Sequence, residues 1–129
     1  MIVLDANVMI AILDSSDAHF QAAQRIFLNH TTERLVAHRI TVGETLVQPA
    51  RAGRTAAAVA ALAMLGVGHL DEPDDPITLA ELRASSGLRL PDCVILHAAL
   101  RDKAKLATFD ARLASAAAGL GVTVVGIEK

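Results

Sequence analysis

Short β-rich runs alternate with longer helical segments along the whole sequence. The runs predicted to be strands are residues 2–4, 35–37, 67–70, 105–107 and 122–125. Because these runs are predominantly apolar, they are typical of parallel strands that are buried on both faces. The alternation favours an α/β fold, a doubly wound three-layer sandwich in which right-handed crossovers place helices on both faces of the sheet.

The segments between these runs have helical periodicity. The predicted helices cover residues 8–13, 19–29, 55–65, 78–85, 91–99 and 110–118, with a further helical segment around Glu44. Gly66 follows the segment 55–65, and Gly119 ends the segment that begins at residue 110. Glycines are common at such helix ends. We therefore expect a central parallel sheet of about five strands flanked by helices.

The length of 129 residues suits one domain, and we expect residues 1–129 to form a single one. Hydrophobic residues make up 53% of the chain, yet the longest apolar stretch, residues 56–67, is too short to span a bilayer. The N-terminus lacks the basic region of a signal peptide. A single cysteine, Cys93, permits no internal disulfide. These features predict a cytoplasmic protein that has no membrane partner.

Four acidic residues stand at predicted element ends or at otherwise apolar positions: Asp5, Glu44, Asp92 and Asp110. A carboxylate in such a place is costly unless a positive partner compensates its desolvation. If the strands before Asp5 and Asp110 are parallel neighbours, both acids emerge at the carboxyl edge of the sheet. Oxygen-only ligand sets suit Mg²⁺ or Mn²⁺, which would activate water to hydrolyse a phosphodiester.

Each acid also has a structural interpretation. Asp5 could cap the first helix, although Asn7 could cap it equally well. Asp92 follows Pro91 in the first turn of a helix, where the dipole alone favours a carboxylate. Asp110 could cap the last helix, as could Thr108.

Glu44 has the strongest structural alternative. Residues 41–44, Thr-Val-Gly-Glu, match the capping box, in which Thr41 caps a helix and the glutamate bonds back to the cap amide. Capping and catalysis therefore remain open for Glu44.

The net charge is −2, from 12 basic and 14 acidic residues. The protein therefore lacks the overall positive charge of proteins that bind nucleic acid through phosphates alone, so any contact with nucleic acid must be local. Candidate RNA-binding cations near the acids are Arg39, Arg51, Arg54 and Arg89, although an ordinary solvated face is the alternative. Only three phenylalanines and no Trp or Tyr occur, so a stacking platform for bases is not expected. His38 follows a predicted strand near Glu44 and is a further candidate for RNA contact.

Four segments together resemble the successive motifs of PIN-domain proteins and, within them, the VapC-like toxins of bacterial toxin–antitoxin pairs. They are residues 2–11 (IVLDANVMIA), the isolated Glu44, residues 90–99 (LPDCVILHAA) and residues 106–110 (LATFD). The resemblance runs from about residue 2 to residue 125. Its specificity lies in the order of the motifs and the length of the chain together.

This resemblance implies a PIN-like sandwich and a Mg²⁺- or Mn²⁺-dependent endoribonuclease that cleaves RNA. It implies a homodimer and a cognate VapB-like antitoxin. The helices at residues 19–29 and 55–65 are the expected walls of the antitoxin groove, because they carry more apolar surface than one small core needs. Carried over, Asp5, Asp92 and Asp110 are metal ligands, and Glu44 positions or deprotonates water. Asn7 and Thr108 support the first and last acids. Ala6 replaces a frequent threonine, which costs no ligand.

Two other functions are alternatives. A phosphoacceptor signalling domain needs paired acids after the first strand and a late lysine, whereas Asp5 stands alone and Lys129 is terminal. A catalytically silent PIN-like scaffold that binds RNA or protein has no need to keep four energetically awkward acids.

Overall fold

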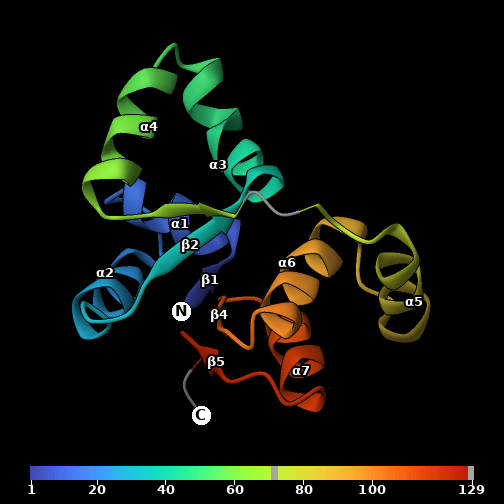
Figure 1. The fold of residues 1–129 in the computed structure, drawn as a ribbon. Coiled ribbons are helices and arrows are strands. Elements are labelled where there is room, and N and C mark those ends of the chain that lie inside the picture. The colour runs from blue at the N-terminus through green and yellow to red at the C-terminus, as the bar shows by residue number, and fades with distance from the viewer. Residues whose placement is uncertain (71–72, 128–129) are drawn as a thin grey trace.

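The computed structural model describes residues 1–70 and 73–127. Within these residues five strands form one sheet in which every pair of neighbours is parallel (Figure 1). The strands are β1 (Ile2–Leu4), β2 (Leu35–His38), β3 (Gly68–Leu70), β4 (Lys105–Ala107) and β5 (Val124–Val125). The predicted α/β fold with a parallel sheet of about five strands is confirmed.

Helices cover both faces of this sheet. They are α1 (Ala6–Leu13), α2 (Phe20–Asn29), α3 (Arg39–Arg51), α4 (Thr55–Met64), α5 (Pro76–Ser86), α6 (Leu90–Arg101) and α7 (Ala111–Gly119). One core joins the sheet to α1, α2 and α4, and the other joins it to α6 and α7. In Figure 1, α3 and α4 lie together at one end of the molecule and α5 lies beside α6.

The strands supply both cores because successive side chains point to opposite faces. Val3 and Leu106 belong to the core on the α6 side, whereas Ile2 and Leu4 belong to the core on the α1 side. All four are fully buried, and each contributes about 1.5–3 kcal/mol by leaving water. The near-continuous apolar runs of the sequence thus reflect burial on both faces.

The strand order is β3-β2-β1-β4-β5, so the chain reverses its direction of winding between β1 and β4. Open α/β sheets bind their ligands at such a switch point, outside the carboxyl ends of the strands. Leu4 is paired with Ala107, and the N–H of Asp5 donates to the carbonyl of Ala107 at 2.9 Å. The residues that follow β1 and β4 are thereby fixed next to each other.

Several element boundaries differ from the predicted ones. The first helix begins at Ala6 and not at residue 8, because Asp5 caps it. The helix that carries Glu44 begins at Arg39, and β5 contains two residues and not four. No helix in the described part of the chain has the length and apolar character needed to cross a membrane.

Candidate functional site

Asp5 lies at the carboxyl edge of β1 and is only 7% exposed. Its Oδ1 accepts a hydrogen bond from the N–H of Ala6 at 2.7 Å, and its Oδ2 accepts one from the hydroxyl of Thr108 at 2.7 Å. Asp5 is therefore the cap of α1. The idea that Asn7 caps this helix as well is wrong, because Asn7 lies inside the first turn.

The hydroxyl of Thr108 connects the ends of β1 and β4. While it donates to Asp5, it accepts from the backbone N–H of Asp110 at 3.0 Å and from Nδ2 of Asn7 at 3.4 Å. The Oδ1 of Asn7 in turn accepts from the N–H of Phe109 at 3.2 Å. Thr108 is fully buried, so these bonds are shielded from water and fix the orientation of the Asp5 carboxylate.

Asp110 caps α7. Its Oδ1 accepts from the backbone N–H of Arg112 at 2.8 Å and of Leu113 at 3.2 Å. Thr108, the alternative cap, holds the backbone of Asp110 instead. Capping leaves Oδ2 of Asp110 without a hydrogen bond to the described residues, so this oxygen is available to a ligand.

Asp92 stands in the first turn of α6 with its side chain 16% exposed. Nε of Arg89 lies 4.0 Å from Oδ2 of Asp92, and the Arg89 side chain is 77% exposed. A pair this long and this exposed is worth at most about 1 kcal/mol. Asp92 is therefore only weakly compensated by the chain.

The three aspartates share one electrostatic environment. Burial raises the pKa of Asp5, the hydrogen bonds from Thr108 and Ala6 oppose this change, and the charges of Asp92 and Asp110 raise the pKa further. Burial also raises the pKa of Asp92, where Arg89 and Arg112 oppose the change and Asp110 adds to it. Burial is the largest cause for both residues, and the neighbouring acids add to it.

Glu44 is placed differently. It lies half-buried on α3, and its charge is not among those that act on Asp5 or Asp92. Electrostatic interactions thus link Asp5, Asp92 and Asp110, and Glu44 is not part of that linked set.

The capping box proposed for Glu44 is wrong. His38 caps α3, because its Nδ1 accepts from the N–H of Ile40 at 3.0 Å while its Nε2 contacts the carboxylate of Asp74 at 3.0 Å. Thr41 lies inside the helix, buried, and its hydroxyl has no hydrogen-bond partner among the described residues. Histidine is not a usual capping residue, so the sequence concealed this start. At 3% exposure, His38 is also unsuited to touch RNA.

The four predicted RNA-binding arginines do not surround one point. Arg39 and Arg51 are the first and last residues of α3 and lie about 18 Å apart along its axis. Arg54 precedes α4 and acts on Asp14. Arg89 borders the aspartates, because its charge acts on Asp92, and sequence reasoning missed Arg112, which acts on Asp92 as well. Its place two residues after Asp110, on the same helical turn, was the signal that could have revealed it.

A divalent cation fits the donor chemistry of this edge. Three carboxylates with crowded negative charge form the hard oxygen set that Mg²⁺ and Mn²⁺ favour. Among residues 1–70 and 73–127, however, no three Asp, Glu, His or Cys side chains converge into a ready-made metal site. The fit therefore rests on charge and ligand type.

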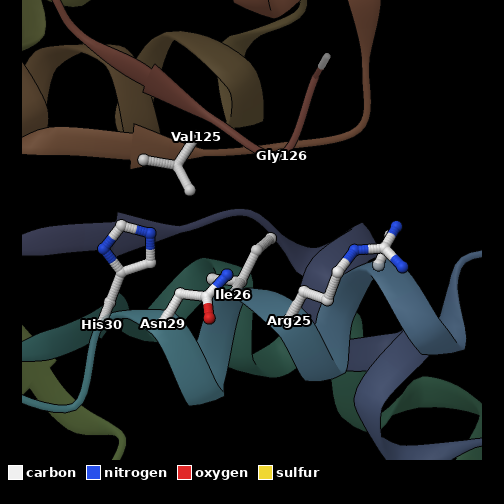
Figure 2. Close-up of a pocket in the computed structure, with 7 residues that line it drawn as sticks. Arg25, Ile26, Asn29, His30, Val125 and Gly126 are labelled. Atoms are coloured by element: carbon white, nitrogen blue, oxygen red, sulfur yellow. The ribbon is translucent and has the colours of Figure 1, made fainter.

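A pocket of about 310 Å³ lies elsewhere, between α2 and the end of β5 (Figure 2). Arg25, Asn29 and His30 line it from α2, facing Val125 and Gly126. None of the four acids lines this pocket. The pocket and the acidic edge are therefore separate features, and the chemistry of the acids identifies the candidate site.

Comparison with known proteins places these observations in a family. The family model described as "PIN domain" matches residues 2–119. Ribonuclease VapC39 from Mycobacterium tuberculosis is 34% identical over 135 aligned residues, which cover 91% of this chain and 94% of the relative.

Solved structures show a similar fold. A chain of a toxin–antitoxin complex from Klebsiella pneumoniae matches with a TM-score of 0.75 and 21% identity, covering 100% of both chains. VapC20 from Mycobacterium tuberculosis, described as a sarcin-ricin loop cleaving toxin, matches with a TM-score of 0.70 and 16% identity over 90% of this chain and 95% of that chain.

Proposed function

Since the chain belongs to the PIN-domain family, we propose that it is a metal-dependent endoribonuclease and the toxin of a VapBC-like toxin–antitoxin pair. The observation that carries this proposal is the crowding of Asp5, Asp92 and Asp110 at the switch point of the sheet. The relative named a ribonuclease supports the choice of RNA as substrate, since it is 34% identical over most of both chains.

Asp5, Asp92 and Asp110 would hold Mg²⁺ or Mn²⁺. When bound, such a cation polarises a phosphodiester and lowers the pKa of a bound water. The chain orients the ligands beforehand: Thr108 and Ala6 fix the carboxylate of Asp5, and the N-terminus of α7 fixes Asp110. Ligands that are held by neighbouring hydrogen bonds lose little freedom when they bind.

Glu44 is proposed to position or deprotonate the attacking water. A carboxylate that is not a metal ligand is free to accept a proton, and the charge of Glu44 is not among those that shift the pKa of Asp5 or Asp92. Asn7 and Thr108 are proposed as supports that keep β1 and β4 in register at the site.

The chain is further proposed to bind a VapB-like antitoxin. α4 and its C-cap expose Val59, Met64 and Leu65, with Met64 89% exposed. A pocket of about 500 Å³, lined in part by Ile10, lies between α1 and α3 beside the start of α4. The similar Klebsiella chain comes from a toxin–antitoxin complex. If the antitoxin inserts Arg or Lys among the aspartates, its inhibition should weaken as Mn²⁺ rises. A homodimer remains part of the proposal, and light scattering of the purified protein checks it.

The test is cleavage of a total RNA pool by purified protein with Mg²⁺, with Mn²⁺ or with EDTA. Cleavage should require the metal and disappear in Asp92→Asn. Glu81→Gln, which changes an exposed acid on α5, is the matched control and should cleave as the wild type does. RNA binding without any cleavage would support a silent scaffold instead. A stable phosphoryl group on Asp5 would support the signalling domain.

A further inference from the structure

A groove of about 660 Å³ lies between the end of α5 and the outer side of α7. Ser85 and Ser86 line it from α5, and Arg112 and Ser115 line it from α7. Among the described residues no acidic one lines this groove, and its apolar wall includes Leu120, which is 51% exposed. Its lining therefore differs in charge from the acidic edge nearby.

Arg112 joins this groove to the acidic edge. It is the second residue of α7, and its backbone N–H is held by the carboxylate of Asp110. Its positive charge also acts on Asp92. One end of the groove thus lies beside two of the three proposed metal ligands.

The guanidinium of Arg112 has room and is not committed to another group. Gly87, which ends α5 at φ 72°, lies next to it, and a Cβ built on Gly87 would stand 3.9 Å from Nη2 of Arg112. Within residues 1–70 and 73–127, no side chain forms an ion pair or a hydrogen bond with this guanidinium. An exposed arginine that is placed but unpaired suits an external anion.

The lining matches the backbone of a nucleic acid more closely than its bases. Arginine and serine side chains are common donors to phosphate oxygens. The donors here are Arg112 and Ser115, because the hydroxyls of Ser85 and Ser86 already donate to the carbonyl of Leu82. The groove has no aromatic residue on which a base could stack. The volume of the groove is in the range of ordinary ligand sites.

The pocket of Figure 2 is the weaker candidate for binding a nucleic-acid backbone. His30 at one end of it is already engaged, because its Nδ1 lies 3.5 Å from Oε2 of Glu33. In addition, α2 ends there and leads back toward the start of β2, away from the carboxyl edge.

On this basis, and resting on the proposed ribonuclease function, we infer that the groove between α5 and α7 holds the RNA strand beside the cleaved bond, with Arg112 binding a backbone phosphate. Arg112 is then a positioning residue for the substrate. It also explains how a chain of net charge −2 would hold RNA next to an acidic edge.

Binding of a fluorescent single-stranded RNA, measured by anisotropy in EDTA at several salt concentrations, tests this without requiring cleavage. Arg112→Ala should bind roughly tenfold more weakly, the loss typical of one charge-assisted contact. The slope of log K against log salt should become shallower by about 0.7, as expected for one phosphate contact fewer on a single strand. Arg112→Lys should keep the wild-type slope.

Ser115→Glu is a second variant at an exposed position one turn along α7, where the new carboxylate would neutralise Arg112. It should weaken binding as Arg112→Ala does. Arg34→Ala removes an exposed arginine that precedes β2, at the opposite edge of the sheet, and should bind as the wild type does. With Mn²⁺, Arg112→Ala should raise KM and leave kcat within about twofold, since uniform binding is lost.

The outcomes separate the two proposals. If the wild type cleaves and binds RNA while Arg112→Ala and Ser115→Glu match it, the groove is not the strand site although the ribonuclease function stands. If the wild type neither binds nor cleaves RNA, both proposals fail. A loss of kcat without a change in KM or in binding would also overturn the assignment of Arg112.

Discussion

Carboxylates at the two edges of the sheet have pKa values that are shifted in opposite directions. At the amino edge, Glu33 bonds to Nζ of Lys105 and lies 3.5 Å from His30. The bond from Lys105 lowers the pKa of Glu33 more than burial raises it, with help from His30 and the N-terminal amine. At the carboxyl edge, burial and neighbouring acids raise the pKa of Asp5 and Asp92.

This difference shows which acids have a compensating positive partner within the protein. Glu33 has its positive partners in the folded protein, so its role is explained by structure alone. Asp5 and Asp92 lie beside further negative charge, and only the exposed Arg89 and Arg112 oppose it at Asp92. Crowded carboxylates persist where an external cation offsets their repulsion.

The largest difference between the edges should appear in cleavage. Asp5→Asn keeps the size of the side chain but removes a ligand charge, so metal-dependent RNA cleavage should fall to the EDTA background. Glu33→Gln makes the same change at the amino edge and should leave the rate within about twofold, because Glu33 is remote from the reaction. Equal losses in both variants would refute the contrast.

Glu44→Gln separates catalysis from metal binding. The change should strongly lower kcat because the group that positions or deprotonates water loses its charge. Affinity for Mn²⁺ should stay unchanged, since Glu44 is proposed to act on water and not as a metal ligand. An unchanged rate would remove Glu44 from the mechanism, and a lost affinity would make it a ligand.

Thr108→Val tests the hydroxyl that joins β1 to β4. The variant keeps the shape but leaves Asp5 and the N–H of Asp110 without their partner, so the free energy of unfolding should drop by about 1–3 kcal/mol. Thr108→Ser should retain most of the stability because it keeps the hydroxyl. Urea denaturation in EDTA measures both, and equal stability of the valine variant would show that this network contributes little.

The pH dependence of stability should differ between the edges in sign. The pKa values of Asp5 and Asp92 are raised above 3.8, so the folded state binds more protons and metal-free stability falls as pH rises from about 3.8 through the raised values. The pKa of Glu33 is lowered from 4.5, so its contribution is present above 4.5 and is lost as pH falls through the lowered value.

Urea titrations in EDTA across this pH range resolve the two contributions. Asp5→Asn should flatten the fall in stability on the rising side, and Glu33→Gln should flatten the loss on the acid side. If Asp5→Asn leaves the pH profile unchanged, the carboxylate of Asp5 does not have the raised pKa that burial and the neighbouring acids predict.

The sequence sufficed for the fold because apolar runs such as residues 2–4 and 105–107 have no solvent face to offer. It also predicted that the residues after these runs share an edge, and the structure joins Asp5 to Thr108 there. That bond spans 103 positions of sequence, so its geometry depends on the register of β1 with β4, which no local pattern encodes.

Other features could not be predicted from the sequence because they depend on tertiary contacts or on an unusual capping residue. The start of α3 rests on a histidine cap that is held by Asp74, 36 residues away. The importance of Arg112 appears only when α7 is placed beside Asp92. A plausible motif, the capping box at Thr41, was wrong because β2 leads directly into the helix two residues earlier.

A calorimetric titration of the metal-free protein with Mn²⁺ tests most directly the central claim that the carboxyl edge is a metal site. The wild type and Glu33→Gln should bind Mn²⁺ with the same affinity, whereas Asp5→Asn and Asp92→Asn should each bind it at least roughly tenfold more weakly, the equivalent of about 1.4 kcal/mol. Equal Mn²⁺ affinity in all four proteins, or none in the wild type, would contradict the assignment of the carboxyl edge as a metal site.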